Sequence, residues 1–199
     1  MEFLLRIAYH VARTGALLGG ILILAAALLI GFDVTIRHFL VKTVGGADEL
    51  AGYALAIATA WTFGFTLICR AHVRIDSLYV YLPSKIRALL DIFGLSLFVF
   101  FMGLLTWHAL GTLRQSIESN SHSISPLGTP LAIPQTLWVM GLFLFMAVAL
   151  LLLVRAVIAL ALNDTPTVMR LIGSRSVEEE VEVELEAAKG SRHSRDTSE

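Results

Sequence analysis

Apolar residues in this chain of 199 residues gather into four long runs, which cover residues 14–32, 50–69, 89–113 and 134–162. A membrane-spanning helix needs about 20 apolar residues, because each residue advances the helix by about 1.5 Å. The sequence between the runs is too short to cover four such helices with a polar surface, which argues against a soluble helical protein. The pattern therefore predicts an all-α membrane protein with four transmembrane helices.

Polar residues set the predicted limits of three parts of the chain. Residues 1–13 carry Arg6, His10 and Arg13 at helical spacing beside apolar residues. This pattern favours a short interfacial amphipathic helix and a frayed polar terminus equally. The transmembrane domain is expected at residues 14–162, with helices at about 14–40, 48–70, 84–114 and 130–162. Residues 163–199 contain the acidic stretch EEEVEVELE, which predicts a cytoplasmic tail that is partly disordered.

Lys and Arg residues determine the predicted orientation. If the N-terminus is cytoplasmic, the cytoplasmic segments through Arg175 hold nine of these residues, and the opposite loops hold three. We therefore expect both termini in the cytoplasm and the two other connections outside. The outer connection 114–133 is Ser-rich and contains Pro126 and Pro130, which predicts an irregular, exposed loop.

Composition excludes several classes of function. Apolar residues make up 56% of the chain and charged residues only 16%, whereas about 25% is usual for soluble proteins. The net charge of −1 offers no basic excess for nucleic acid, and the single cysteine, Cys69, excludes chemistry that needs a cysteine pair. The deep parts of the four helices carry no charged residue, and a lone histidine such as His108 is more readily explained by a hydrogen bond to a neighbouring helix than by a proton relay. We expect no enzymatic activity, catalytic residue, metal site or cofactor, and a supporting role for the chain.

Several short motifs occur in an order that resembles a known family. They are Asp33-Val34 with Arg37, Glu49, Arg70-Ala71-His72-Val73-Arg74-Ile75-Asp76, Ser125-Pro126, Ile133-Pro134-Gln135 and Trp138. Over roughly residues 5–162 the chain is similar to the small permease subunit of TRAP transporters, the tripartite ATP-independent periplasmic transporters (DctQ-like). One departure is Ala71, where members of the family often have glycine.

The resemblance implies a place in the bacterial inner membrane and a defined set of partners. Such systems import organic acids, driven by a sodium gradient. The small subunit would brace a large permease subunit, which must be a separate chain here, and help dock a periplasmic substrate-binding protein. The membrane lipids are the remaining expected partner. Two other functions stay open on the residues alone: a stand-alone small oligomeric carrier, and a membrane anchor that recruits a partner through its acidic tail.

Two charged clusters are candidate sites. Asp33, Arg37 and Glu49 are expected to tie the outer ends of the first two helices and to fix the face that meets the binding protein; the alternative is a solvated pair worth about 0–1 kcal/mol.

The second cluster follows the second helix. His72 and Asp76, with Arg74, are expected to form a knot in the inner leaflet or to contact the large subunit. The alternative is contact between positive charge and lipid phosphate, which we prefer for Arg70 and Arg74. Arg155 is also expected to reach the headgroups.

Overall fold

The computed structural model describes residues 2–40, 43, 45–70 and 82–173. These residues form five helices: α1 (Glu2–Leu40), α2 (Ala47–Ile68), α3 (Ser84–Glu118), α4 (Ala132–Ala161) and α5 (Thr165–Ile172). Outside the helices, the described residues include one isolated β-bridge, between His122 and Pro130. The chain is therefore all-α over the part that the structure describes, as the apolar pattern predicts.

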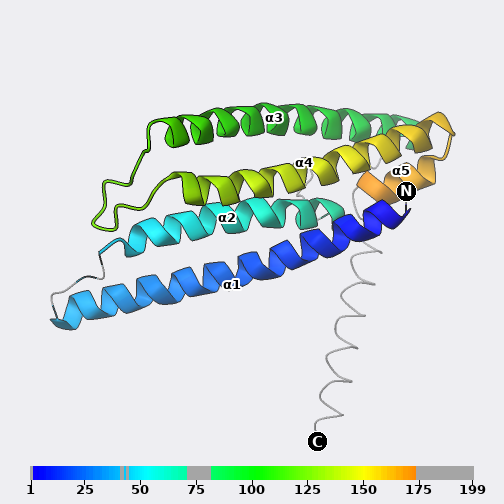
Figure 1. Ribbon diagram of the computed structural model, residues 1–199. Coiled ribbons are helices and arrows are strands. Elements are labelled where there is room, and N and C mark those ends of the chain that lie inside the picture. The colour runs from blue at the N-terminus through cyan, green and yellow to red at the C-terminus, as the bar shows by residue number, and fades with distance from the viewer. Residues whose placement is uncertain (1, 41–42, 44, 71–81, 174–199) are drawn as a thin grey trace, which may run out of the picture.

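The long helices lie roughly side by side in an elongated bundle (Figure 1). The α1–α2 and α3–α4 connections lie at one end of the bundle, which we call the loop end, and α5 and the N-terminus lie at the other, the α5 end. α1 packs mainly on α2, and α4 packs on both α2 and α3. α4 is thus the central helix, and α1 and α3 are the flanks.

Four of the helices, α1 to α4, are long and apolar enough to cross a membrane. The 39 residues of α1 correspond to about 58 Å, almost twice the hydrocarbon core of about 30 Å. α1 therefore extends into the headgroup layers on one or both sides. This confirms the predicted four spans, while the side on which the termini lie stays a prediction.

Residues 2–13 do not form an element separate from the first transmembrane helix. Residues 2–13 are the first turns of α1, and the helix continues through them without a break. No glycine or proline stands before Gly15, so the sequence offers no residue that would end a helix there. Their position at the membrane interface stays a prediction.

The segment expected to be an acidic tail begins with α5. This helix has Asp164 at its N-cap, whose side chain accepts a hydrogen bond from the Thr167 backbone N–H at 3.1 Å, and a proline in its first turn. Val168 and Ile172 are buried against the α3–α4 pair. The rest of the expected tail, residues 174–199, lies outside the described residues.

The core is built around α4. Phe145 is 1% exposed and contacts the ring of Phe63 on α2 and the ring of Phe98 on α3, with centroids 6.0 and 5.5 Å apart. Nearer the loop end, Trp61 of α2 donates an indole hydrogen bond to the Leu137 carbonyl of α4 at 2.9 Å. These contacts fix α2 and α3 on two sides of α4.

Glycines let the helices approach closely around Trp61. A Cβ at Gly141 of α4 would lie 2.7 Å from Trp61 Cδ1 and 3.0 Å from the Ala60 backbone carbon. On the other side, a Cβ at Gly15 of α1 would lie 3.2 Å from Trp61 Cε3. Trp61 is therefore held between α1 and α4, at two positions where a larger residue would push the helices apart.

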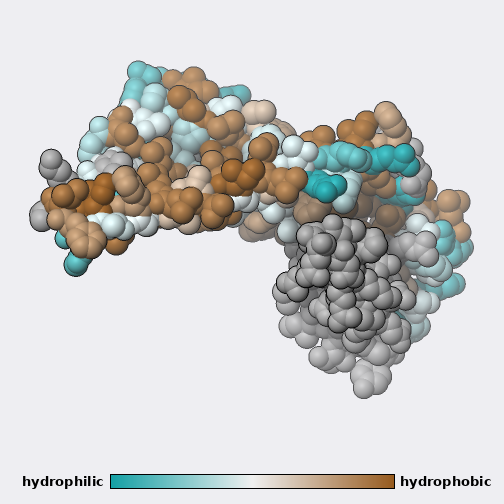
Figure 2. Space-filling view, turned by 90° about the horizontal axis from the view of Figure 1, so that it is seen from below, coloured by the Kyte–Doolittle hydropathy of each residue, from teal (hydrophilic) through white to brown (hydrophobic). Residues whose placement is uncertain are grey.

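The outward faces of the bundle are apolar. Within the most apolar part of α1 only 11% of the residues are buried inside the protein, against 39% in α4. Figure 2 looks at the bundle from the side on which α1 lies and shows hydrophobic residues along much of that face. This surface suits contact with lipid tails or with an apolar face of another protein.

We predict that Gly141→Leu destabilises the bundle, because the new side chain would collide with Trp61 and with the backbone of α2. The expected loss of unfolding free energy is about 1–3 kcal/mol, the usual cost of overpacking. It is measured as a lower melting temperature of the detergent-solubilised chain. Gly94→Leu is the matched control, because a Cβ at Gly94 meets no heavy atom within 4 Å. Equal melting temperatures for the two variants would show that the α2–α4 contact is not tight.

Candidate functional site

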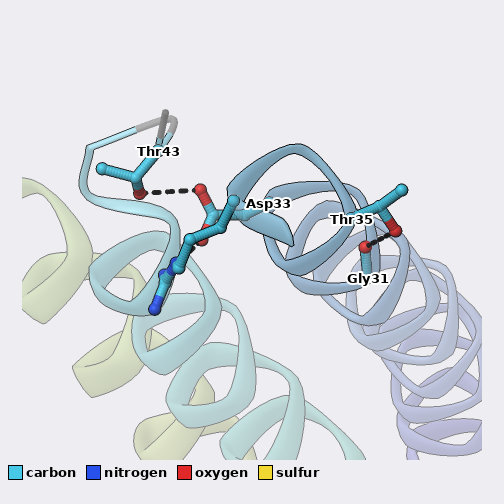
Figure 3. A network of polar contacts seen from close by, with 5 residues as sticks. Gly31, Asp33, Thr35 and Thr43 are labelled. Atoms are coloured by element: carbon cyan, nitrogen blue, oxygen red, sulfur yellow. Dashed lines mark hydrogen bonds and ion pairs between the residues drawn. The ribbon is translucent and has the colours of Figure 1, made fainter. Parts of the chain in front are cut away.

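The loop end holds a buried carboxylate. Asp33, about two turns before the end of α1, is 2% exposed. Arg37 Nη2 donates to Asp33 Oδ2 at 2.5 Å, and Thr43 Oγ1 donates to Oδ1 at 2.8 Å. Figure 3 shows Asp33 turned toward Thr43, which lies beyond the end of α1. Hydrogen bonds to a charged group are worth about 1.5–3 kcal/mol, so this carboxylate stabilises the reversal of the chain after α1.

Arg37, unlike its partner, is largely exposed at the surface of the protein. Its side chain is 57% exposed, although its partner Asp33 is buried. The pair is spaced i, i+4 on α1, as the sequence predicts. The guanidinium group therefore satisfies Asp33 and at the same time presents a positive charge at the loop end.

Glu49 forms a second network in the first turn of α2. Its Oε1 accepts a hydrogen bond from Tyr53 Oη at 2.7 Å, and its Oε2 accepts one from Ser125 Oγ. A carboxylate is also favoured at this position by the positive end of the helix dipole. Since Ser125 lies in the α3–α4 connection, Glu49 joins the start of α2 to a segment 76 residues away.

The α3–α4 connection is ordered by its own backbone. The Ser123 N–H donates to the Thr129 carbonyl at 2.9 Å, and the Leu131 N–H donates to the Ser121 carbonyl at 3.0 Å. The segment contains no helix or strand, in line with the expected irregular loop, but these hydrogen bonds close it into a hairpin-like turn.

This turn rests on the α1–α2 connection. Leu127 lies so close to Gly46 that a Cβ on Gly46 would be 2.3 Å from Leu127 Cδ1. Gly46 also has a φ of 88°, which favours glycine. The residues just before α2 and the α3–α4 connection thus pack against each other at the loop end.

The predicted three-residue tie is divided between two networks. Asp33 and Arg37 pair as expected, but Glu49 is bound to Tyr53 and Ser125. Tyr53 and Ser125 were not among the predicted partners of Glu49. The spacing of Tyr53 four residues after Glu49 was a usable signal, whereas the position of Ser125 depends on how the α3–α4 connection folds.

The α5 end has a different arrangement. Arg70, with a φ of 53°, lies two residues after the end of α2, and its Nη1 donates to the Met169 carbonyl of α5 at 3.3 Å. Arg155 of α4 is half-buried, with its Nη1 buried. Asp91 of α3 is 5% exposed. Arg70 therefore lies partly against α5, where lipid was expected, and Arg155 lies partly against protein. Their contact with headgroups stays a prediction.

Three further candidate residues fall in the segment 71–81. His72, Arg74 and Asp76 lie outside the described residues, so the predicted inner-leaflet knot stays a prediction. In the described part of the chain, no group of three or more His, Cys, Asp or Glu residues is placed to hold a metal ion. His108 lies on an exposed face of α3, and the hydrogen bond expected to a neighbouring helix stays a prediction.

We predict that Ser125→Ala loosens the loop end, because Glu49 loses the donor that joins α2 to the α3–α4 connection. Amide hydrogen exchange across residues 121–131 should become about tenfold faster, as expected for the loss of a hydrogen bond to a charged group. Ser119→Ala is the control, since the Ser119 hydroxyl bonds to the Gln115 carbonyl of its own helix. Unchanged exchange in Ser125→Ala would show that the Glu49 bond does not hold the turn.

Comparison with known protein families matches residues 26–159 to the family described as "Tripartite ATP-independent periplasmic transporters, DctQ component". The matched segment runs from the middle of α1 to the last turn of α4 and includes both networks of the loop end. Comparisons with curated proteins and with solved structures give no match.

Proposed function

Because the chain belongs to the DctQ component family of the tripartite ATP-independent periplasmic transporters, we propose that it is the small membrane subunit that scaffolds the large permease subunit. In this role it also helps to dock the periplasmic substrate-binding protein during sodium-driven uptake of organic acids. The observation that carries the proposal is the combination of a tightly packed core, without charged residues in the central stretches of the helices, with an ordered polar surface at the loop end.

The interior of the bundle supports a scaffolding role. A carrier needs polar groups within the membrane to hold its cargo, and such groups are costly there. The central stretches of the four helices carry no charged residue, and the core consists of aromatic and aliphatic contacts around α4. Long exposed apolar faces on α1 and α3 offer surface for a lasting contact with a second membrane protein.

The loop end supports a docking role. Its two connections are held by Asp33, Glu49 and their hydroxyl donors, and they pack on each other at Gly46 and Leu127. A surface that is ordered before binding loses little conformational entropy when a partner arrives. Arg37, exposed beside this surface, offers a charge for a partner protein to recognise.

Reconstitution tests the proposal directly. We expect the chain to co-purify with the large permease subunit, and sodium-dependent uptake in liposomes to need both chains and the binding protein. Arg37→Ala should leave co-purification intact. It should lower the association rate with the binding protein by about threefold to tenfold, since an exposed charge at an interface acts mainly on that rate. When uptake is measured against the concentration of binding protein, the concentration that gives half-maximal uptake should rise.

Arg13→Ala is the matched control for Arg37→Ala, because Arg13 is an exposed arginine of the same helix in its other half. Full uptake by the large subunit without this chain would contradict the proposal, as would accumulation of a solute by this chain alone. Loss of uptake on deletion of residues 174–199, with co-purification retained, would favour an anchor that acts through its tail.

We also propose that His72 and Asp76 contact α3 or the large subunit near the α5 end, whereas Arg70 and Arg74 also meet lipid headgroups. His72→Ala and Asp76→Ala should each lower the recovery of the large subunit in a pull-down by about threefold or more, as expected for the loss of an interfacial hydrogen bond. Lys85→Ala, an exposed charge at the start of α3, serves as the control. Undiminished recovery with both variants would refute the proposed contact.

A further inference from the structure

A groove runs along one side of α3 in the half nearer the loop end. It has a volume of about 560 Å³ and is open to the surroundings along its length, because all the residues that line it belong to α3. Trp107, Gly111, Arg114 and Glu118 line it. These residues follow one another at spacings of three and four, so they share one face of the helix. The remaining lining is aliphatic and includes Leu110 and Ile117.

The polarity of the groove changes along the helix axis. The 35 residues of α3 correspond to about 52 Å, so a helix centred on a core of about 30 Å extends by roughly seven residues at each end. Arg114 and Glu118 then lie at headgroup depth. Trp107, 73% exposed, lies just inside the hydrocarbon boundary, where tryptophan is enriched in membrane proteins. The groove therefore leads from the headgroup layer into the apolar layer.

Both charges in the groove are available to a ligand. Arg114 and Glu118 are spaced i, i+4 and exposed, yet the ion pair found among the described residues joins Arg37 and Asp33. Between them and Trp107, Gly111 leaves a notch, because a Cβ at that position would meet no heavy atom within 4 Å. A ligand that fits this arrangement carries a negative and a positive group at one end and an apolar chain at the other.

We propose that this groove binds one zwitterionic glycerophospholipid. Arg114 contacts the phosphate, Glu118 contacts the headgroup amine, and an acyl chain lies along Gly111 and Trp107. A helix of another protein would need two complementary charges at matching heights, whereas a single headgroup supplies both. The proposal requires that α3 crosses a bilayer and that this side of α3 faces lipid, so it stands whichever way the chain is oriented.

Native mass spectrometry of the full-length chain, extracted in mild detergent and supplied with phosphatidylethanolamine or phosphatidylglycerol, tests the site. We expect one phosphatidylethanolamine to remain bound per chain. Arg114→Gln should lower its retention about tenfold, the effect expected for losing a charge-assisted contact to phosphate. Glu118→Gln should remove the preference for phosphatidylethanolamine over phosphatidylglycerol, which has no amine. Lys85→Gln, at the opposite end of α3, should change neither result.

A second variant separates loss of the site from loss of the fold. Gly111→Leu fills the notch without a collision inside the protein, so lipid retention should fall about tenfold while the melting temperature of the delipidated chain stays unchanged. Retention equal to that of the native chain in both Arg114→Gln and Gly111→Leu would overturn the proposal. A photoreactive residue at position 110 gives a further test in intact membranes. Crosslinks to another protein, with none to lipid, would also overturn the proposal.

Discussion

The position of Trp61 between α1 and α4 is the contact on which the rest of the bundle depends. In a bilayer the hydrophobic effect gives no drive for helices to associate, because lipid tails are as apolar as leucine side chains. Close packing and hydrogen bonds between helices must supply that drive. Trp61 provides both, since its indole fits against Gly15 and Gly141 and its N–H binds the Leu137 carbonyl. With α2 fixed in this way, α3 joins the other side of α4 through the Phe98–Phe145 ring contact and aliphatic packing.

This way of packing also explains why the polar networks lie at the ends. A charged side chain at the centre of a membrane helix costs about 2.5–3.5 kcal/mol on insertion scales, and α1 to α4 have none there. At the loop end, Asp33 and Glu49 can be ionised and still be satisfied by hydroxyl donors and by Arg37. Packing in the interior therefore determines the distances between the helices. The hydrogen bonds of the carboxylates at the loop end stabilise the conformation of the connections.

Local patterns were enough to predict some of these features and not others. The four spans follow from run length, and the Asp33–Arg37 pair follows from helical spacing, because both depend on neighbouring residues alone. The bond between Glu49 and Ser125 could not be predicted, since it joins residues 76 positions apart and needs the hairpin-like turn to form first. α5 had a local signal in Asp164 followed by Thr165-Pro166, but the acidic sequence further on favoured a tail. The charged residues before residue 14 led to the prediction of a separate interfacial helix, although no helix-breaking residue divides residues 2–13 from the rest of α1.

The uneven burial of the helices bears on how a scaffold of this kind would act. α4 is packed on two sides, whereas α1 is attached mainly through α2 and leaves most of its apolar surface open. A helix held along one side keeps its position only if that contact is stiff, and the small residues of α1 at the interface, Ala12, Gly15 and Gly19, bring it close enough to α2 for that. The open face of α1 can then be covered by lipid or protein without any rearrangement of the bundle. In the proposed scaffolding role, such a subunit would hold its partner by shape along the apolar layer, and the loop end would supply the charged groups that a partner recognises.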